Sequence, residues 1–139
     1  MLKKTVTSTD FNGVERKEDY YFNLTEAELT EMELSTEGGL YEYLQKIINA
    51  KDQTQLIDVF KKIVLKAYGE KSDDGKYFMK SDEIRKKFEA TQAYSDIYME
   101  LVLDDVAASK FIDAILPNVD KLKGKIESRQ KALGVPPKE

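Results

Sequence analysis

The stretch LIDVFKKIVLKA, residues 56–67, has a strongly helical pattern. Its apolar side chains recur every three or four residues, which places them on one face of a helix: Leu56, Val59, Phe60, Ile63, Val64 and Ala67. A second stripe of this kind precedes it, at Leu40, Leu44, Ile47 and Ile48. Because each apolar face must be buried, we expect the two helices to pack as a helical hairpin. Gly69 is expected to end the second helix as its C′ residue.

On the N-terminal side, residues 3–23 have the alternation and composition of a β-hairpin. Lys4–Thr9 is rich in β-branched residues and Glu18–Leu24 in aromatic ones. Asn12-Gly13, between them, is typical of the central positions of a tight turn. A lone hairpin is marginal in water, so this one is expected to pack on a helical body.

The end of this hairpin leads directly into a helix start. Alternation in a strand places Tyr20 and Phe22 on one face and Tyr21 on the other. Thr25-Glu26-Ala27-Glu28 is a capping box, in which the threonine hydroxyl and the glutamate satisfy each other's backbone amides. It predicts a short helix over residues 26–34.

Further helices are expected on the C-terminal side. Residues 72–76 predict a turn, Tyr77–Met79 an extended segment, and Ser81 the N-cap of a new helix. Apolar positions at helical spacing continue to residue 115: Ile84, Phe88, Tyr94, Ile97, Tyr98, Leu101, Val102, Ala108, Phe111, Ile112 and Ile115. Pro117 ends the compact part.

The predicted fold is mainly α with a small N-terminal β-hairpin, an α+β arrangement built around a compact bundle of about five to seven short helices. Residues 1–117 form a single globular domain in this prediction, with the hairpin at 3–23 and helices from residue 26. Residues 118–139 form a basic helical C-terminal extension with a frayed, Pro-rich end.

The charge of the chain and the length of its apolar runs argue against nucleic-acid and membrane partners. The chain of 139 residues has 22 basic and 26 acidic side chains, a net charge of −4. Residues 1–117 have a net charge of −7 and residues 118–139 of +3. A chain this acidic makes a poor nucleic-acid binder. No apolar run is long enough to span a membrane, and none follows the first residues as in a signal peptide.

The chain contains no histidine and no cysteine. Their absence removes the commonest general base, thiolate chemistry and the usual zinc ligands. Glu70–Ser81 mimics a calcium loop, but Ser81 stands where the bidentate glutamate belongs. The paired acidic residues lie at turns and helix starts, where helix dipoles favour them. We therefore predict a protein that is not an enzyme and has no cofactor or metal site.

Aromatic and sulfur-containing side chains remain as candidate contacts with other proteins. Eight tyrosines and six phenylalanines are more than the helical stripes use. Candidate contact residues, beside or off the core faces, are Tyr21, Tyr41, Tyr43 and Met99. Tyrosine and methionine are favoured at protein contacts because they give a large, adaptable area. Scattered surface side chains that form no site explain the same residues equally well.

Nine short segments carry a likeness in order through residue 117: Thr9–Arg16, Asp19–Thr25, Glu31–Ser35, Gly38–Leu40, Ile63–Gly69, Lys71–Gly75, Gln92–Ser95, Met99–Leu101 and Ala107–Ser109. Together they resemble a family of tail assembly chaperones from long-tailed, siphovirus-type bacteriophages of Gram-positive bacteria. The likeness of motifs ends at Pro117. Such chaperones are often made as a short product and a frameshifted longer one, and the sequence leaves open to which product residues 118–139 belong.

The resemblance implies a cytoplasmic factor that is not part of the mature virion. Its implied partners are the tape-measure protein, which it binds and keeps soluble, and the tail-tube protein, whose subunits it helps to recruit. Self-association along the tape-measure rod is compatible with this role. The alternative is a structural or connector subunit of the tail.

Overall fold

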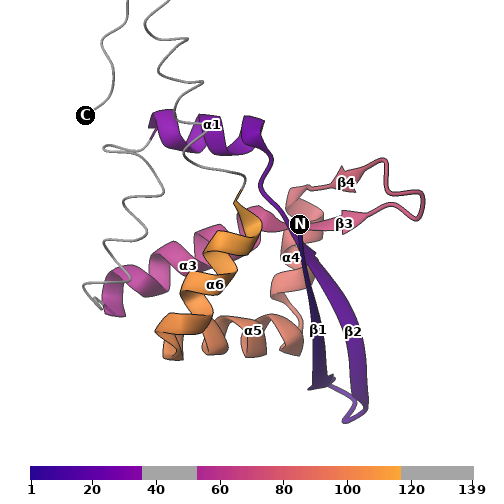
Figure 1. The fold of residues 1–139 in the computed structure, drawn as a ribbon. Coiled ribbons are helices and arrows are strands. Elements are labelled where there is room, and N and C mark those ends of the chain that lie inside the picture. Colours follow the sequence, from indigo (N-terminus) through magenta and orange to yellow (C-terminus); the bar gives the residue numbers. More distant parts are fainter. Residues whose placement is uncertain (36–52, 117–139) are drawn as a thin grey trace, which may run out of the picture.

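A computed structural model describes residues 1–35 and 53–116 of the chain. These residues form four strands and five helices (Figure 1). In chain order they are β1 (Leu2–Thr9), β2 (Glu15–Phe22), α1 (Glu26–Ser35), α3 (Gln53–Ala67), β3 (Tyr68–Lys71), β4 (Phe78–Met79), α4 (Asp82–Glu89), α5 (Gln92–Leu103) and α6 (Asp105–Ile115). The predicted helix around 40–48 and the extension 118–139 lie outside the described residues. The helical hairpin and the domain division at residue 117 therefore stay predictions.

The strands form one antiparallel sheet in the order β1-β2-β3-β4. The prediction of a mainly α protein with only a small N-terminal hairpin is therefore wrong, and the fold is α+β with a four-stranded sheet. The hairpin itself is confirmed, because β1 pairs with β2 along its whole length. The sequence prediction lacked β3, which adds to β2 through Tyr21↔Gly69 and Phe22↔Tyr68. The predicted extended segment Tyr77–Met79 contains β4, but its pairing with β3 was not predicted.

The sequence conceals β3 because this strand follows α3 without a break. Helix α3 ends at Ala67 and β3 begins at the next residue, so Gly69 resembles the end of a helix. Gly69 instead lies inside β3, opposite β4. A Cβ atom at Gly69 would lie 2.8 Å from Cε2 of Phe78 and 2.9 Å from the carbonyl oxygen of Met79. The close approach of β4 is therefore what requires glycine here.

Phe22, the last residue of β2, lies at the centre of the hydrophobic core and is fully buried. Its ring centroid lies 5.3 Å from that of Phe111, 5.7 Å from Tyr68 and 5.8 Å from Phe88, each in an edge-to-face arrangement. Such aromatic pairs add about 0.5–1.5 kcal/mol beyond area burial. Other members of this core come from the helices and the segment after β2: Leu24, Leu29, Phe60, Ile63, Val64, Ala67, Ile97, Leu101, Ala108, Ile112 and Ile115. Sheet and helices thus share one core.

The backbone after β2 ties the sheet to the ends of two helices. The amide of Asn23 donates a hydrogen bond to the carbonyl of Ala67 at the end of α3 (2.9 Å). The amide of Leu24 donates to the carbonyl of Ile115 at the end of α6 (3.1 Å). These bonds satisfy carbonyls that the helices leave unpaired, and they fix where the hairpin leaves the body.

Lys80, directly after β4, links the second hairpin to the start of α1. Its ammonium lies 2.7 Å from Oε2 of Glu28 and 2.7 Å from the carbonyl oxygen of Asn23. Glu28 also completes the predicted capping box: its amide donates to the Thr25 hydroxyl (3.2 Å), and its carboxylate accepts from the Thr25 amide (3.1 Å). Burial is the largest single influence and raises the pKa of Glu28, but the hydrogen bonds from Lys80 and Thr25, together with the charge of Lys80, hold that pKa below its usual range.

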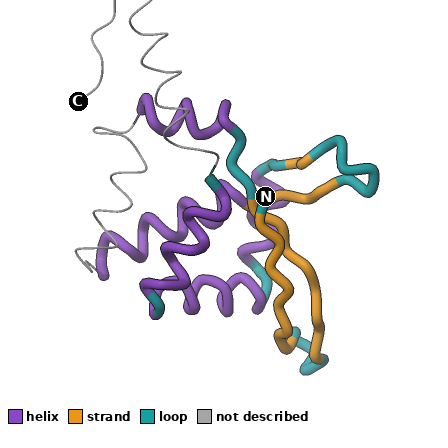
Figure 2. Tube along the Cα trace, in the orientation of Figure 1, coloured by secondary structure: helices purple, strands orange, loops and turns teal. Residues whose placement is uncertain are grey.

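The helices cover one face of the β1–β2 hairpin. Along β1, Leu2, Lys4, Val6 and Ser8 are partly buried, and the residues between them are exposed. Helix α5 packs on β1, where the Lys4 ammonium lies 3.2 Å from Oε1 of Glu100. Figure 2 shows the helices on one side, with both hairpins projecting from them. No helix in the described part of the chain is long and apolar enough to cross a membrane.

Candidate protein-contact site

The tip of the β1–β2 hairpin is a short turn held by Asp10. The Gly13 amide donates to the Asp10 carbonyl (3.0 Å), and Gly13 is in the left-handed region at φ 79°. The central turn residues are therefore Phe11 and Asn12, one position earlier than the predicted Asn12-Gly13. The Asp10 carboxylate accepts hydrogen bonds from the amides of Asn12 and Val14, both at 2.9 Å. This arrangement leaves the Phe11 side chain 79% exposed at the tip.

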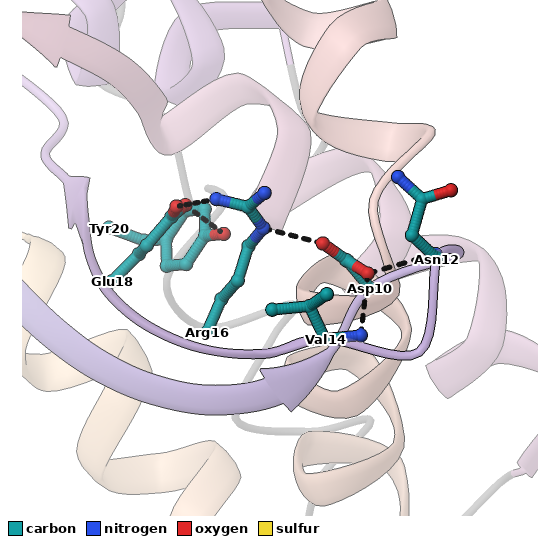
Figure 3. A network of polar contacts seen from close by, with 6 residues as sticks. All are labelled: Asp10, Asn12, Val14, Arg16, Glu18 and Tyr20. Carbon is teal, nitrogen blue, oxygen red and sulfur yellow. Dashed lines mark hydrogen bonds and ion pairs between the residues drawn. The ribbon is translucent and has the colours of Figure 1, made fainter.

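A row of polar side chains continues from the tip along β2 (Figure 3). Nε of Arg16 donates to Oδ2 of Asp10 at 2.6 Å, and Nη1 of Arg16 lies 3.9 Å from Oε1 of Glu18. The Tyr20 hydroxyl donates to Oε2 of Glu18 at 3.2 Å. Because each member contacts the next, the row connects the turn to the base of the strand and restricts the motion of the tip.

The charges in this row are stable near neutral pH. The hydrogen bond from Arg16 holds the pKa of Asp10 below its usual value, and the same bond raises the pKa of Arg16. Burial, and then the charge of Glu18, raises the pKa of Tyr20 to about 12, so its hydroxyl remains a donor.

A hollow of about 300 Å³ lies between this row and the turn that joins α4 to α5. Its lining residues are Ser8, Asp10, Phe11, Arg16, Glu18, Tyr20, Ala90, Thr91, Gln92 and Ala93. On the helical side, the Thr91 hydroxyl accepts a hydrogen bond from the Tyr94 amide (3.1 Å) and caps α5. Both walls are therefore held by local hydrogen bonds, with Phe11 among the residues that line the hollow.

The β3–β4 hairpin has a similar construction. The Gly75 amide donates to the Ser72 carbonyl (2.9 Å), and Gly75 is left-handed at φ 76°. The Asp74 carboxylate accepts from the Lys76 amide (3.0 Å) and from the Ser72 hydroxyl (2.8 Å). This confirms the predicted turn at 72–76. Tyr77, beside the turn, is 65% exposed.

These features suit contact with another protein. Both hairpins present an exposed aromatic side chain beside a turn that an aspartate holds in place. Aromatic side chains are enriched at protein interfaces because they bury a large area with few rotatable bonds. Within residues 1–35 and 53–116, no group of three or more acidic side chains is placed to hold a metal ion.

A family model for phage tail assembly chaperones matches residues 1–135 of the chain. The chain belongs to this family. The match continues past Pro117, where the likeness of motifs ends, and includes most of the basic segment. No curated protein and no solved structure matches the chain significantly. Membership in the family implies that this chaperone binds other tail proteins.

The structure places two of the four predicted contact residues of this tail assembly chaperone. Tyr21 is half-buried on the open face of β2, with the Lys71 ammonium 5.7 Å from its ring centroid. Met99 is 46% exposed on α5, which packs on the opposite face of the sheet. The two residues therefore do not form one site. Tyr41 and Tyr43 lie outside the described residues, and all four stay proposed contacts.

Sequence reasoning did not find Phe11, the most exposed aromatic side chain in the described part of the chaperone. The turn signal at Asn12-Gly13 between two strand patterns indicated its neighbourhood, but not which residue occupies the tip. Leu103, one helical turn after Met99, and Val106 at the start of α6 were also missed. Both side chains are exposed, although apolar residues in or beside amphipathic helices are usually expected to be buried.

Proposed function

We propose that this tail assembly chaperone binds the tape-measure protein of its phage, keeps it soluble before assembly, and helps to bring tail-tube subunits to it. It acts in the bacterial cytoplasm and does not remain in the mature virion. The family match supports the chaperone role, and the likeness of motifs to chaperones of long-tailed phages supports the choice of client.

The observation that carries the proposal is Phe11 on the tip that Asp10 and Arg16 hold. An aromatic side chain on a rigid support loses little conformational entropy when a partner covers it. A long helical client such as a tape-measure protein exposes apolar stripes that need a partner before the tail forms. Phe11, together with the hollow below the tip, gives such a stripe an apolar contact.

The charge of the chain supports the same role. Residues 1–117 have a net charge of −7, which keeps a complex with an apolar client in solution. Copies that associate with one another along the rod link their contacts with it, so a modest contact at each hairpin tip is sufficient.

Co-expression with the tape-measure protein tests the proposal. We expect the wild-type chain to increase the soluble fraction of the client and to co-purify with it. Phe11→Ser removes the apolar contact and reduces co-purification, whereas Phe11→Tyr keeps the ring and retains it. Asp10→Ala leaves Phe11 in place but loosens the turn, so it has an intermediate effect.

Tyr77→Ser is the matched control, because Tyr77 is an exposed aromatic residue on the other hairpin. An equal loss of client with Tyr77→Ser and Phe11→Ser would contradict a specific role for the first hairpin tip. A client that is equally soluble with and without the chaperone would overturn the proposed function. Stoichiometric amounts of the chain in purified virions would instead identify a structural subunit of the tail.

A further inference from the structure

Among the described residues, no strand pairs with the outer edge of β1. In an antiparallel pair, residues whose backbone groups point at the partner strand alternate with residues whose groups point away. The bond from the Asp10 amide to the Val14 carbonyl (2.8 Å) continues the β1–β2 register. It shows which residues of β1 direct their backbone groups at β2. The even-numbered residues of β1 therefore bond to β2. The outward groups belong to Lys3, Thr5, Thr7 and Thr9.

No described residue forms a backbone hydrogen bond with these outward groups. In the described part of the chain, none of the four residues has a backbone hydrogen bond besides those of the β1–β2 ladder, and all four are exposed. Natural edge strands are commonly protected by proline, bulges or several charges. On this row of β1 the only charged side chain is Lys3, and β1 contains neither proline nor glycine.

A groove of about 400 Å³ lies beside the same edge, between β1 and helices α5 and α6. No residue of β2 lines the groove, so it lies on the free side of β1. Its apolar lining consists of Leu2, Val106, Ala107, Phe111 and Ala114. Val106 is 62% exposed, so its side chain is accessible at the groove.

The two acidic side chains that line the groove already have partners inside the chain. Glu100 pairs with the Lys4 ammonium at 3.2 Å. The Asp104 carboxylate caps α6 by accepting hydrogen bonds from the amides of Val106 (3.0 Å) and Ala107 (3.1 Å). These carboxylates therefore do not require a charged ligand. Lys110 is the other charged side chain of the lining besides Lys4, and the remaining lining residues are apolar.

We propose that β1 binds an extended segment of a tail-protein partner as an additional strand of the sheet. This inference rests on the proposed function and names the binding mode. The outward groups of β1 bond to the backbone of the segment, and every second side chain of the segment points into the groove. The partner segment is therefore extended, with apolar side chains at alternate positions.

A second copy of this chain fits the edge less well. If two β1 strands paired antiparallel about a two-fold axis, both α5 helices would lie on the same face of the joined sheet. Helix α5 packs on β1 itself, and paired strands lie only about 4.8 Å apart. Packed helices need about 8–10 Å between their axes, so an in-register pair of β1 strands leaves too little room for the two α5 helices. A single strand without its own helix meets no such obstacle.

Binding of overlapping peptides from the tape-measure and tail-tube proteins of the same phage tests the proposal. Peptides of about twelve residues are long enough to cover β1. We expect the bound peptides to share apolar residues at alternate positions. Methylating the backbone nitrogens of a bound peptide one at a time is expected to block binding at every second residue only, because alternate amides face β1.

Two variants of the full chain complete the test. Thr7→Pro removes an outward N–H that the β1–β2 ladder does not use, and it is expected to weaken peptide binding by about tenfold or more. Thr7→Val keeps the N–H and binds as the wild type does. Val106→Glu places a charge in the groove without touching β1, and it also weakens binding. Circular dichroism and thermal melting establish that the variants are folded.

Several outcomes would overturn the inference. Unchanged peptide binding by folded Thr7→Pro would do so, as would a methylation pattern without a period of two residues. A dimer that Thr7→Pro dissociates, with no peptide bound, would assign the edge to a second copy. If whole client proteins bind but no peptide does, the inference fails and the proposed function stands. If neither binds, both fail.

Discussion

Replacing Gly69 with alanine tests whether β3 and β4 belong to the sheet. The new methyl group would lie 2.8 Å from Cε2 and 2.9 Å from Cζ of Phe78, and 2.9 Å from the carbonyl oxygen of Met79. Ordinary contacts of a Cβ atom are 3.4–4 Å. The Phe78 ring can turn aside, but the Met79 carbonyl belongs to the backbone of β4, which pairs with β3 through Glu70↔Met79. The strand itself must therefore move.

The expected cost is about 1–3 kcal/mol in the free energy of unfolding, as for other insertions of a methyl group into a packed site. For a chain of this size the melting temperature then falls by roughly 3–10 °C. The sign of the change is decisive. Without the clash, the same substitution would stabilise the protein by about 0.4–1 kcal/mol, because alanine restricts the unfolded chain more than glycine does.

Urea denaturation followed by circular dichroism measures the change, with thermal melting as a second readout. Phe78→Leu provides a double-mutant cycle: it relieves the contacts with the ring but not the contact with the Met79 carbonyl, so the double variant recovers only part of the loss. Gly75→Ala is the control for backbone strain alone, since Gly75 has φ 76° and nothing within 4 Å of an added Cβ. If Gly69→Ala melts at or above the wild-type temperature, the placement of β4 beside Gly69 is wrong.

Three further predictions concern the core, an ion pair and a helix cap. Phe22→Ala is expected to lower the free energy of unfolding by about 3–5 kcal/mol in urea titrations, since it opens a cavity between the sheet and the helices; a loss below about 1 kcal/mol would contradict its central position. Lys80→Met removes the ion pair with Glu28, whose carboxylate keeps only its hydrogen bonds from Thr25, and is expected to cost about 1–3 kcal/mol at neutral pH. Because the folded pKa of Glu28 lies below its unfolded value near 4.5, its stabilising effect is present above that pH and is lost as the pH falls through the lower folded pKa. Acid titration of stability is therefore expected to be shallower in Glu28→Gln than in the wild type, and parallel curves would refute the assignment. Thr91→Ala removes the cap of α5 and is expected to cost about 1 kcal/mol, while Thr91→Ser retains most of the stability.

Local patterns in the sequence predicted most helices and the first hairpin. The stripe at residues 56–67, the capping box at Thr25 and the serine cap before α4 depend on neighbours within about four residues, so periodicity and side-chain chemistry are sufficient to place them. Composition alone excludes many kinds of site, because the chain has neither histidine nor cysteine. The ordered likeness of motifs identified the chaperone family, which the family model confirms.

Features that depend on residues far apart in the sequence could be found only in the folded protein. Strand β3 exists because Gly69 and Tyr68 pair with the end of β2, more than forty residues earlier. Strand β3 is too short to show the alternation of apolar and polar residues that indicates a strand. Helix α3 ends directly before it, so the segment resembles the end of a helix. The groove beside β1 depends on where α5 and α6 pack. Local residue patterns are thus sufficient for most helices, the first hairpin and the family, whereas the four-stranded sheet and the groove beside its edge result from long-range packing, which has no local signal.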